Sequence, residues 1–100
     1  MLSREQLKVS EERIDQSGLF CALVTEDMLK DEQCLYEWNY AKNKGKEFAL
    51  IIKKGNRIPE EMLKGANVVY KKFFEKPEDL NEIGMDFRKR FGRMEVLENQ

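Results

Sequence analysis

Two polar segments of this sequence could carry chemistry, because each follows an apolar run that is typical of a buried strand. Glu37 lies on the first turns of the helix predicted after Leu19–Val24, and the loop Lys53–Asn56 follows Phe48–Ile52. Ligands of open α/β sheets collect beyond the carboxyl ends of the strands. A carboxylate there can orient hydroxyl groups of a ligand, and lysines can bind its phosphate group. The loop lacks a glycine-rich fingerprint, so a plain solvated turn is its alternative.

The residue types exclude several other kinds of chemistry. The sequence contains no histidine, so serine–histidine and cysteine–histidine catalytic arrangements cannot form. The two cysteines, Cys21 and Cys34, lack the paired spacing of a zinc site. We therefore predict no metal site and two reduced, buried thiols. Among the polar residues we predict ligand-binding roles for Thr25, Lys53 and Asn56.

Seven elements are predicted to position these residues, in the order helix, strand, helix, strand, short helix, strand, helix. The first helix is predicted at Ser3–Ile14, and the three strands at Leu19–Val24, Phe48–Ile52 and Asn67–Tyr70. This alternation predicts an α/β three-layer sandwich with a small parallel sheet of flavodoxin-like type. We expect about three strands and three to four helices in one domain, residues 1–100, with 93–100 as a frayed tail.

Local signals mark the expected ends of the helices. Ser3 and Gln6 form a capping-box pattern, and Asp31 can cap the helix that carries Glu37. Pro77 is predicted to open the last helix. These residues supply the backbone partners that helix ends lack.

The predicted sheet has one inconsistency. Three strands leave room for one central strand, yet Leu19–Val24 and Phe48–Ile52 both lack polar alternation, as central strands do. An apolar edge strand is a template for pairing with another chain. We therefore expect Leu19–Val24 to be an exposed edge of the monomer, covered by a second copy or another protein. The predicted interface residues are Leu19, Ala22, Leu23, Tyr36 and Tyr40.

The aromatic residues around Glu37 could either bind a partner or pack in the core. Tyrosine and tryptophan dominate binding hot spots, so Tyr36 and Tyr40 could anchor a partner. Trp38 instead continues the apolar face of its helix, and we predict that it packs in the core. The alternative for Glu37 is an ordinary solvated glutamate on an amphipathic helix.

Composition narrows the class of protein. A net charge of −1 over 100 residues argues against a nucleic-acid binder. No apolar run approaches the roughly 20 residues needed to span a bilayer, so we predict no membrane association. The charged start of the sequence is unlike a signal peptide, and a cytoplasmic location is the resulting prediction.

The segment Thr25–Trp38 resembles the Toll/interleukin-1 receptor (TIR) domain family. In that family an apolar strand ends in serine, and a tryptophan–cysteine pair and then a glutamate follow on the next helix. Thr25, Cys34 and Glu37 stand at the serine, cysteine and glutamate positions, and Gln33 replaces the tryptophan. The similarity covers about residues 5–91 and lacks the N-terminal third of the family fold.

The resemblance implies a function by assembly. TIR domains signal by associating with one another, so the expected partner is a second copy or another TIR-like protein. In TIR domains that cleave NAD, this glutamate acts at the ribose next to nicotinamide. The alternative function is therefore an NAD-binding or NAD-hydrolysing domain with Glu37 as the catalytic carboxylate, as in glycosyl transfer generally. Because the missing third supplies one wall of that pocket, we favour a module without enzymatic activity, and NAD as a ligand rather than a cofactor.

Overall fold

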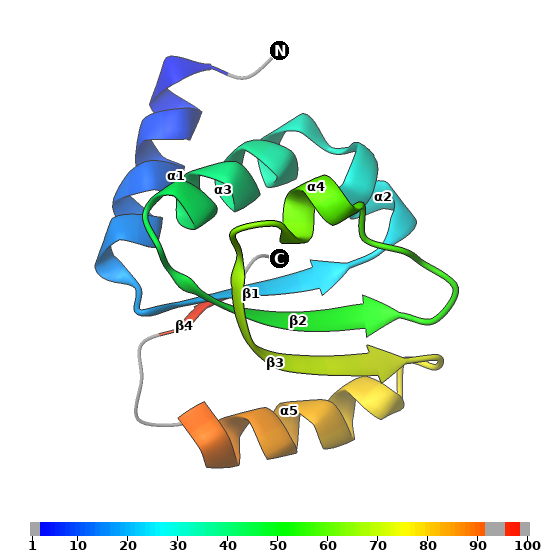
Figure 1. Cartoon of the computed structure of the whole chain (residues 1–100). Coiled ribbons are helices and arrows are strands. Elements are labelled where there is room, and N and C mark those ends of the chain that lie inside the picture. The colour runs from blue at the N-terminus through cyan, green and yellow to red at the C-terminus, as the bar shows by residue number, and fades with distance from the viewer. Residues whose placement is uncertain (1–2, 92–95, 99–100) are drawn as a thin grey trace.

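The computed structural model describes residues 3–91 and 96–98. Within them helices and strands alternate along the chain (Figure 1). The helices are α1 (Arg4–Gln16), α2 (Glu26–Lys30), α3 (Glu32–Asn43), α4 (Glu60–Leu63) and α5 (Asp79–Phe91). The strands are β1 (Leu19–Val24), β2 (Glu47–Lys53), β3 (Asn67–Phe74) and β4 (Val96–Glu98). The predicted α/β class is confirmed.

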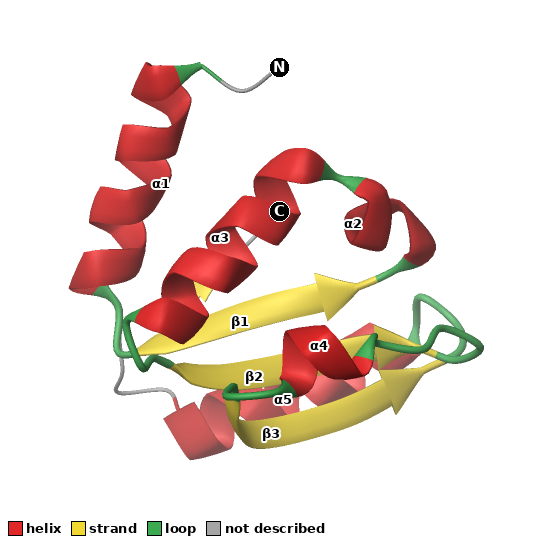
Figure 2. Ribbon diagram, turned by 45° about the horizontal axis from the view of Figure 1, so that its top comes forward, coloured by secondary structure: helices red, strands yellow, loops and turns green. Residues whose placement is uncertain are grey.

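The strands form one parallel sheet in the order β3-β2-β1-β4. Helices α1 to α4 lie on one side of the sheet and α5 on the other (Figures 1 and 2). The predicted three-layer arrangement with a small parallel sheet is therefore present, with one strand more than expected.

Two cores, one on each face of the sheet, explain why β1 is apolar throughout. Side chains of a strand alternate between faces. Phe20, Ala22 and Val24 pack under the helices of the first side. Leu19 belongs to the second core, and the half-buried Cys21 packs against it, on the side covered by α5. Four of the six residues of β1 are therefore buried, and Leu23, on the α5 side, is the one exposed position.

Trp38 of α3 joins the helical layer to the sheet. Its indole ring lies 4.8 Å from the Phe48 ring and 6.4 Å from the Phe20 ring, centroid to centroid. The indole Nε1 donates a hydrogen bond of 2.8 Å to the carbonyl oxygen of Met62, at the end of α4. The side chain is fully buried, which confirms its predicted place in the core.

The helix caps follow the sequence signals closely. Ser3 and Gln6 form the predicted capping box at the start of α1. The Asp31 carboxylate accepts from the backbone N–H of Cys34 and caps α3. The short helix α2 was not predicted; it forms because the Thr25 hydroxyl accepts the Met28 N–H, 3.2 Å away.

The last helix begins two residues later than predicted, at Asp79 rather than Pro77. The Asp79 carboxylate accepts hydrogen bonds from the backbone N–H groups of Lys76 and Glu75, each 3.0 Å long. These two donors hold the pKa of Asp79 below its usual value. The resulting turn occupies the residues expected to be helical.

Strand β3 is longer than predicted, because it continues past Tyr70 to Phe74. Tyr70 and Phe74 are buried in the core under α5, while Lys71, Lys72 and Phe73 between them are exposed. The strand lies at the outer edge of the sheet, where polar side chains find water. The run of lysines therefore concealed strand structure.

The expectation that β1 is an exposed edge is wrong for half of its length. Strand β4 pairs with residues Leu19–Cys21, so the chain covers its own sheet edge there. The predicted frayed tail is likewise wrong for Val96–Glu98, and its other residues, 93–95 and 99–100, lie outside the described residues. No sequence pattern indicates this pairing, because β4 pairs through backbone N–H and C=O groups, which almost every residue carries.

Candidate functional site

A polar pocket lies beyond the carboxyl ends of β1 and β2. Because the two strands are parallel and in register from Leu19 to Val24, the segments that follow them meet at one edge of the sheet. The pocket has a volume of about 480 Å³ and is lined by Thr25, Glu26, Asp27, Lys53, Lys54, Gly55 and Asn56. The three predicted ligand-binding residues therefore lie around one cavity. The sequence analysis did not predict the two carboxylates of the lining, Glu26 and Asp27, which also follow β1 closely.

The loop after β2 is fixed by hydrogen bonds. The backbone N–H and the side-chain Nδ2 of Asn56 both donate to the Lys53 carbonyl oxygen, and each hydrogen bond is 3.2 Å long. The Lys54 N–H donates to the carbonyl oxygen of Phe74, 2.8 Å away at the end of β3. Gly55 has a φ of +93°, which a side chain would strain. One wall of the pocket is thus formed before any ligand arrives.

Two ion pairs occupy one acidic and one basic residue of the pocket, so one charged residue of each sign remains without such a pair in the described part of the chain. Glu26 pairs with Lys30 at 3.1 Å, and Lys54 pairs with Glu75 at 3.6 Å. Asp27 and Lys53 have no ion-pair partner within residues 3–91 and 96–98. These two charges, on opposite segments, are available to a ligand. The Thr25 hydroxyl accepts from Met28 and keeps its own hydrogen for donation.

Glu37 is not among the residues that line this pocket. It lies on the side of α3 that faces α1, where its Oε2 accepts a hydrogen bond of 2.6 Å from the Ser10 hydroxyl. Ser10 is buried and Glu37 is half-buried. The predicted catalytic carboxylate is therefore engaged between two helices, apart from the predicted ligand-binding residues.

The two tyrosines predicted to face a partner are half-buried and connect α3 to α1, while their contact with a partner stays a prediction. Tyr36 donates to the Glu11 carboxylate, and Tyr40 donates to both oxygens of Asp15, at 2.9 and 3.0 Å. Their rings stack at 6.5 Å between centroids. Both phenol groups donate hydrogen bonds to carboxylates of α1 that lie 25 residues earlier in the chain. No local sequence pattern indicates contacts over this separation.

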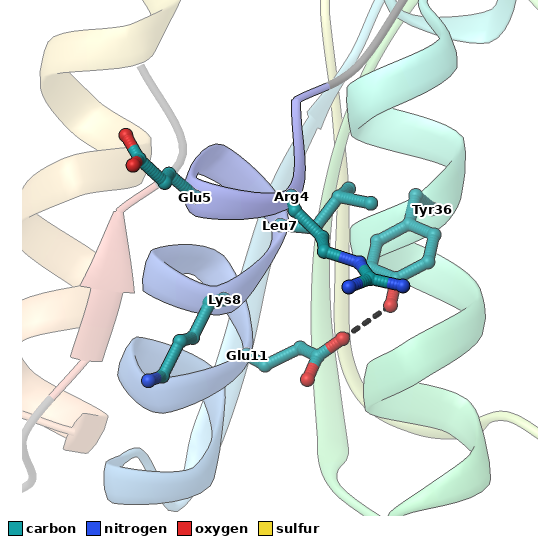
Figure 3. A pocket seen from close by; sticks show the side chains of 6 residues that line it. All are labelled: Arg4, Glu5, Leu7, Lys8, Glu11 and Tyr36. Atoms are coloured by element: carbon teal, nitrogen blue, oxygen red, sulfur yellow. Dashed lines mark hydrogen bonds between the residues drawn. The ribbon is translucent and has the colours of Figure 1, made fainter.

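A second cavity, of about 420 Å³, opens between α1 and α3 beside Tyr36 (Figure 3). Arg4 and Leu7 lie toward the Tyr36 ring, whereas Glu5 and Lys8 point away from it (Figure 3). Its lining combines the apolar side chain of Leu7 and the ring of Tyr36 with four charged residues: Arg4, Glu5, Lys8 and Glu11. Of these, Glu11 is hydrogen-bonded to the Tyr36 hydroxyl.

Alkaline pH is expected to weaken the fold through two tyrosines. Burial and a hydrogen bond to a carboxylate raise the pKa from 10.0 to about 12 for Tyr40, bonded to Asp15, and for Tyr70, bonded to Asp86. A phenol whose pKa is higher in the folded chain stabilises the fold below its unfolded pKa and loses this contribution as the pH rises through its folded pKa. The free energy of unfolding should therefore fall between pH 10 and 12.

Urea unfolding at a series of pH values measures this loss, with phenolate absorbance as a second readout. The variant carrying Tyr40→Phe and Tyr70→Phe should lose less stability over the same pH range. Equal losses in the two proteins would contradict the assignment.

The three interface predictions on β1 have different outcomes. The side chains of Leu19 and Ala22 are fully buried within the chain, so neither can contact a partner. Leu23 exposes 39% of its surface.

The predicted thiols, Cys21 and Cys34, are half-buried rather than buried.

Comparison with known proteins finds no matching family model, no matching characterised protein and no matching solved structure. Within the described part of the chain, no three histidine, cysteine, aspartate or glutamate side chains are grouped to hold a metal ion. No helix of that part is both long and apolar enough to cross a membrane.

Proposed function

We propose that this chain is a cytoplasmic, TIR-like interaction module that self-associates through the uncovered half of β1. The observation that carries the proposal is the extent of β4, whose described residues pair with Leu19–Cys21 of β1. Among the described residues, no strand pairs with Ala22–Val24 on that side. An unpaired edge offers backbone donors and acceptors to another chain.

An exposed apolar strip lies next to this edge and supports the same proposal. It consists of Leu23 together with the half-buried Cys21 and Ile51. Leu23 is opposite Ile51 in the register of β1 and β2, and Cys21 precedes it by two residues, so all three face the α5 side. Helix α5 lies under β3 (Figure 1), and on this side of β1 Leu19 is buried whereas Leu23 stays 39% exposed. A second copy of β1 would bury the strip.

The order of strands and helices also supports a TIR-like reading. Thr25 directly follows β1, and Cys34 and Glu37 lie on α3, the positions that the resemblance implies. NAD hydrolysis takes second place as a function, because Glu37 is bonded to Ser10 and lies apart from the polar pocket.

Replacing Leu23 by lysine is expected to weaken self-association by about tenfold or more, which corresponds to about 1.4 kcal/mol or more. The substitution places a charge in the strip that the second copy would bury, and a charge is costly to bury without a partner. Light scattering over a concentration series measures the dissociation constant of the dimer.

The matched control is Val9→Lys on α1, where valine exposes 55% of its surface outside the strip. This variant should associate as the unmodified chain does. A chain that is monomeric at every concentration would overturn the proposal, as would equal weakening by the two variants.

A further inference from the structure

We propose that the polar pocket at the ends of β1 and β2 binds a phosphorylated sugar. The inference goes beyond self-association, because it concerns a small ligand and a different set of residues. Its basis is a preformed cavity of about 480 Å³ with charges of both signs on opposite walls. Cavities of this size fall within the roughly 300–1,000 Å³ of small-molecule sites.

The wall after β2 suits the phosphate group. The Lys53 ammonium has no ion-pair partner among the described residues, so no internal bond must break before it binds an anion. Lys54, paired with Glu75 at 3.6 Å, adds a second positive charge to the same wall. A Cβ built on Gly55 would meet nothing within 4 Å, so a ligand can reach the backbone there. Lysine binds phosphate as a point charge.

The wall after β1 suits hydroxyl groups. The Asp27 carboxylate is exposed and without an ion-pair partner in the described part of the chain, so it can accept two hydrogen bonds. The Thr25 hydroxyl can donate one, because its oxygen already accepts from Met28. Glu26 lies beside them. Neighbouring hydroxyls of a sugar present donors and acceptors in this combination.

The same walls disfavour two simpler or larger ligands. Inorganic phosphate alone would meet Glu26 and Asp27, two carboxylates that repel it. A nucleotide would bring a base, and bases are held by stacking on aromatic side chains. The pocket has no aromatic or apolar side chain in its lining. A ligand with one anionic end and one hydroxyl-rich end satisfies both walls.

A titration of the ¹⁵N-labelled chain with ribose 5-phosphate, ribose, inorganic phosphate and adenosine monophosphate tests the proposal. Ribose 5-phosphate should shift the amide signals of Thr25, Gly55 and Asn56 and should bind most tightly of the four. Lys53→Gln should weaken its binding by about tenfold or more. Lys71→Gln, an equal loss of charge on the exposed edge strand, should leave binding unchanged.

Asp27→Asn gives the most discriminating result, because its two effects have opposite signs. Binding of ribose 5-phosphate should weaken through loss of a hydroxyl partner. Binding of inorganic phosphate should strengthen, because one repelling charge is gone. Glu12→Gln, an exposed carboxylate on α1, is the control and should change neither.

Three results would overturn the proposal. The first is the absence of amide shifts at millimolar ribose 5-phosphate. The second is tighter binding of adenosine monophosphate, which would assign the pocket to nucleotides. The third is equal affinity for inorganic phosphate, unaffected by Asp27→Asn. None of these depends on the oligomeric state, so the two proposals can fail separately.

Discussion

Replacing Trp38 by alanine should lower the free energy of unfolding by about 3–5 kcal/mol, the cost usual for removing a large buried aromatic side chain. The indole fills the space between α3 and the sheet and contacts the rings of Phe20 and Phe48. Its removal leaves a cavity and an unpaired carbonyl at Met62. Domains of this size have about 5–15 kcal/mol of stability in total, so much of it would be lost.

Trp38→Phe separates packing from hydrogen bonding in this prediction. Phenylalanine keeps a ring against Phe20 and Phe48 but cannot donate to the Met62 carbonyl. We expect a loss of about 1–3 kcal/mol for this variant. Urea unfolding followed by circular dichroism measures both. A loss below about 1 kcal/mol for Trp38→Ala would contradict the central place of this residue in the core.

Deleting residues 92–100 should destabilise the chain and strengthen its self-association. The deletion removes β4 and leaves the backbone of Leu19–Cys21 paired with β2 alone, with no described strand on its other side. A ladder of three residues contributes about 2 kcal/mol if each hydrogen bond adds about 0.5–1.5 kcal/mol. The freed edge extends the template already open at Ala22–Val24, so a second copy can pair along the whole of β1.

Removing residues 99–100 alone is the control for this deletion, because it leaves Val96–Glu98 of β4 in place. The shorter truncation should keep the stability and the dissociation constant of the full chain. Urea unfolding and light scattering on the three chains give both quantities. Unchanged stability and unchanged association after the longer deletion would show that β4 contributes nothing to the sheet edge.

Part of the lining of the polar pocket could be predicted from the sequence. Thr25, Lys53 and Asn56 could be predicted to gather, because each follows a strand and parallel strands end at one edge. Asp27 could have been found by the same rule, since it also follows β1 closely. The ion pairs that occupy Glu26 and Lys54 could not, because they depend on side-chain positions after folding.

Glu37 shows where sequence reasoning reached its limit. Its place on a helix was predicted correctly, although α2 separates that helix from β1. Its direction was not, because Ser10 lies 27 residues away in sequence and contacts it only when α1 packs on α3. The pairing of Tyr36 with Glu11 has the same origin.

The sequence by itself determined the parallel α/β class, the approximate places of seven of the nine described elements, and the caps of α1 and α3. These features arise within a few residues: an unbroken apolar run is typical of a strand between two layers of helices, and Asp31 caps the N–H three residues ahead. The tertiary structure alone decided that β4 covers half of β1 and that α1 covers Glu37. Such contacts join distant residues through backbone pairing and helix packing, and their free energy exists only once the chain has folded.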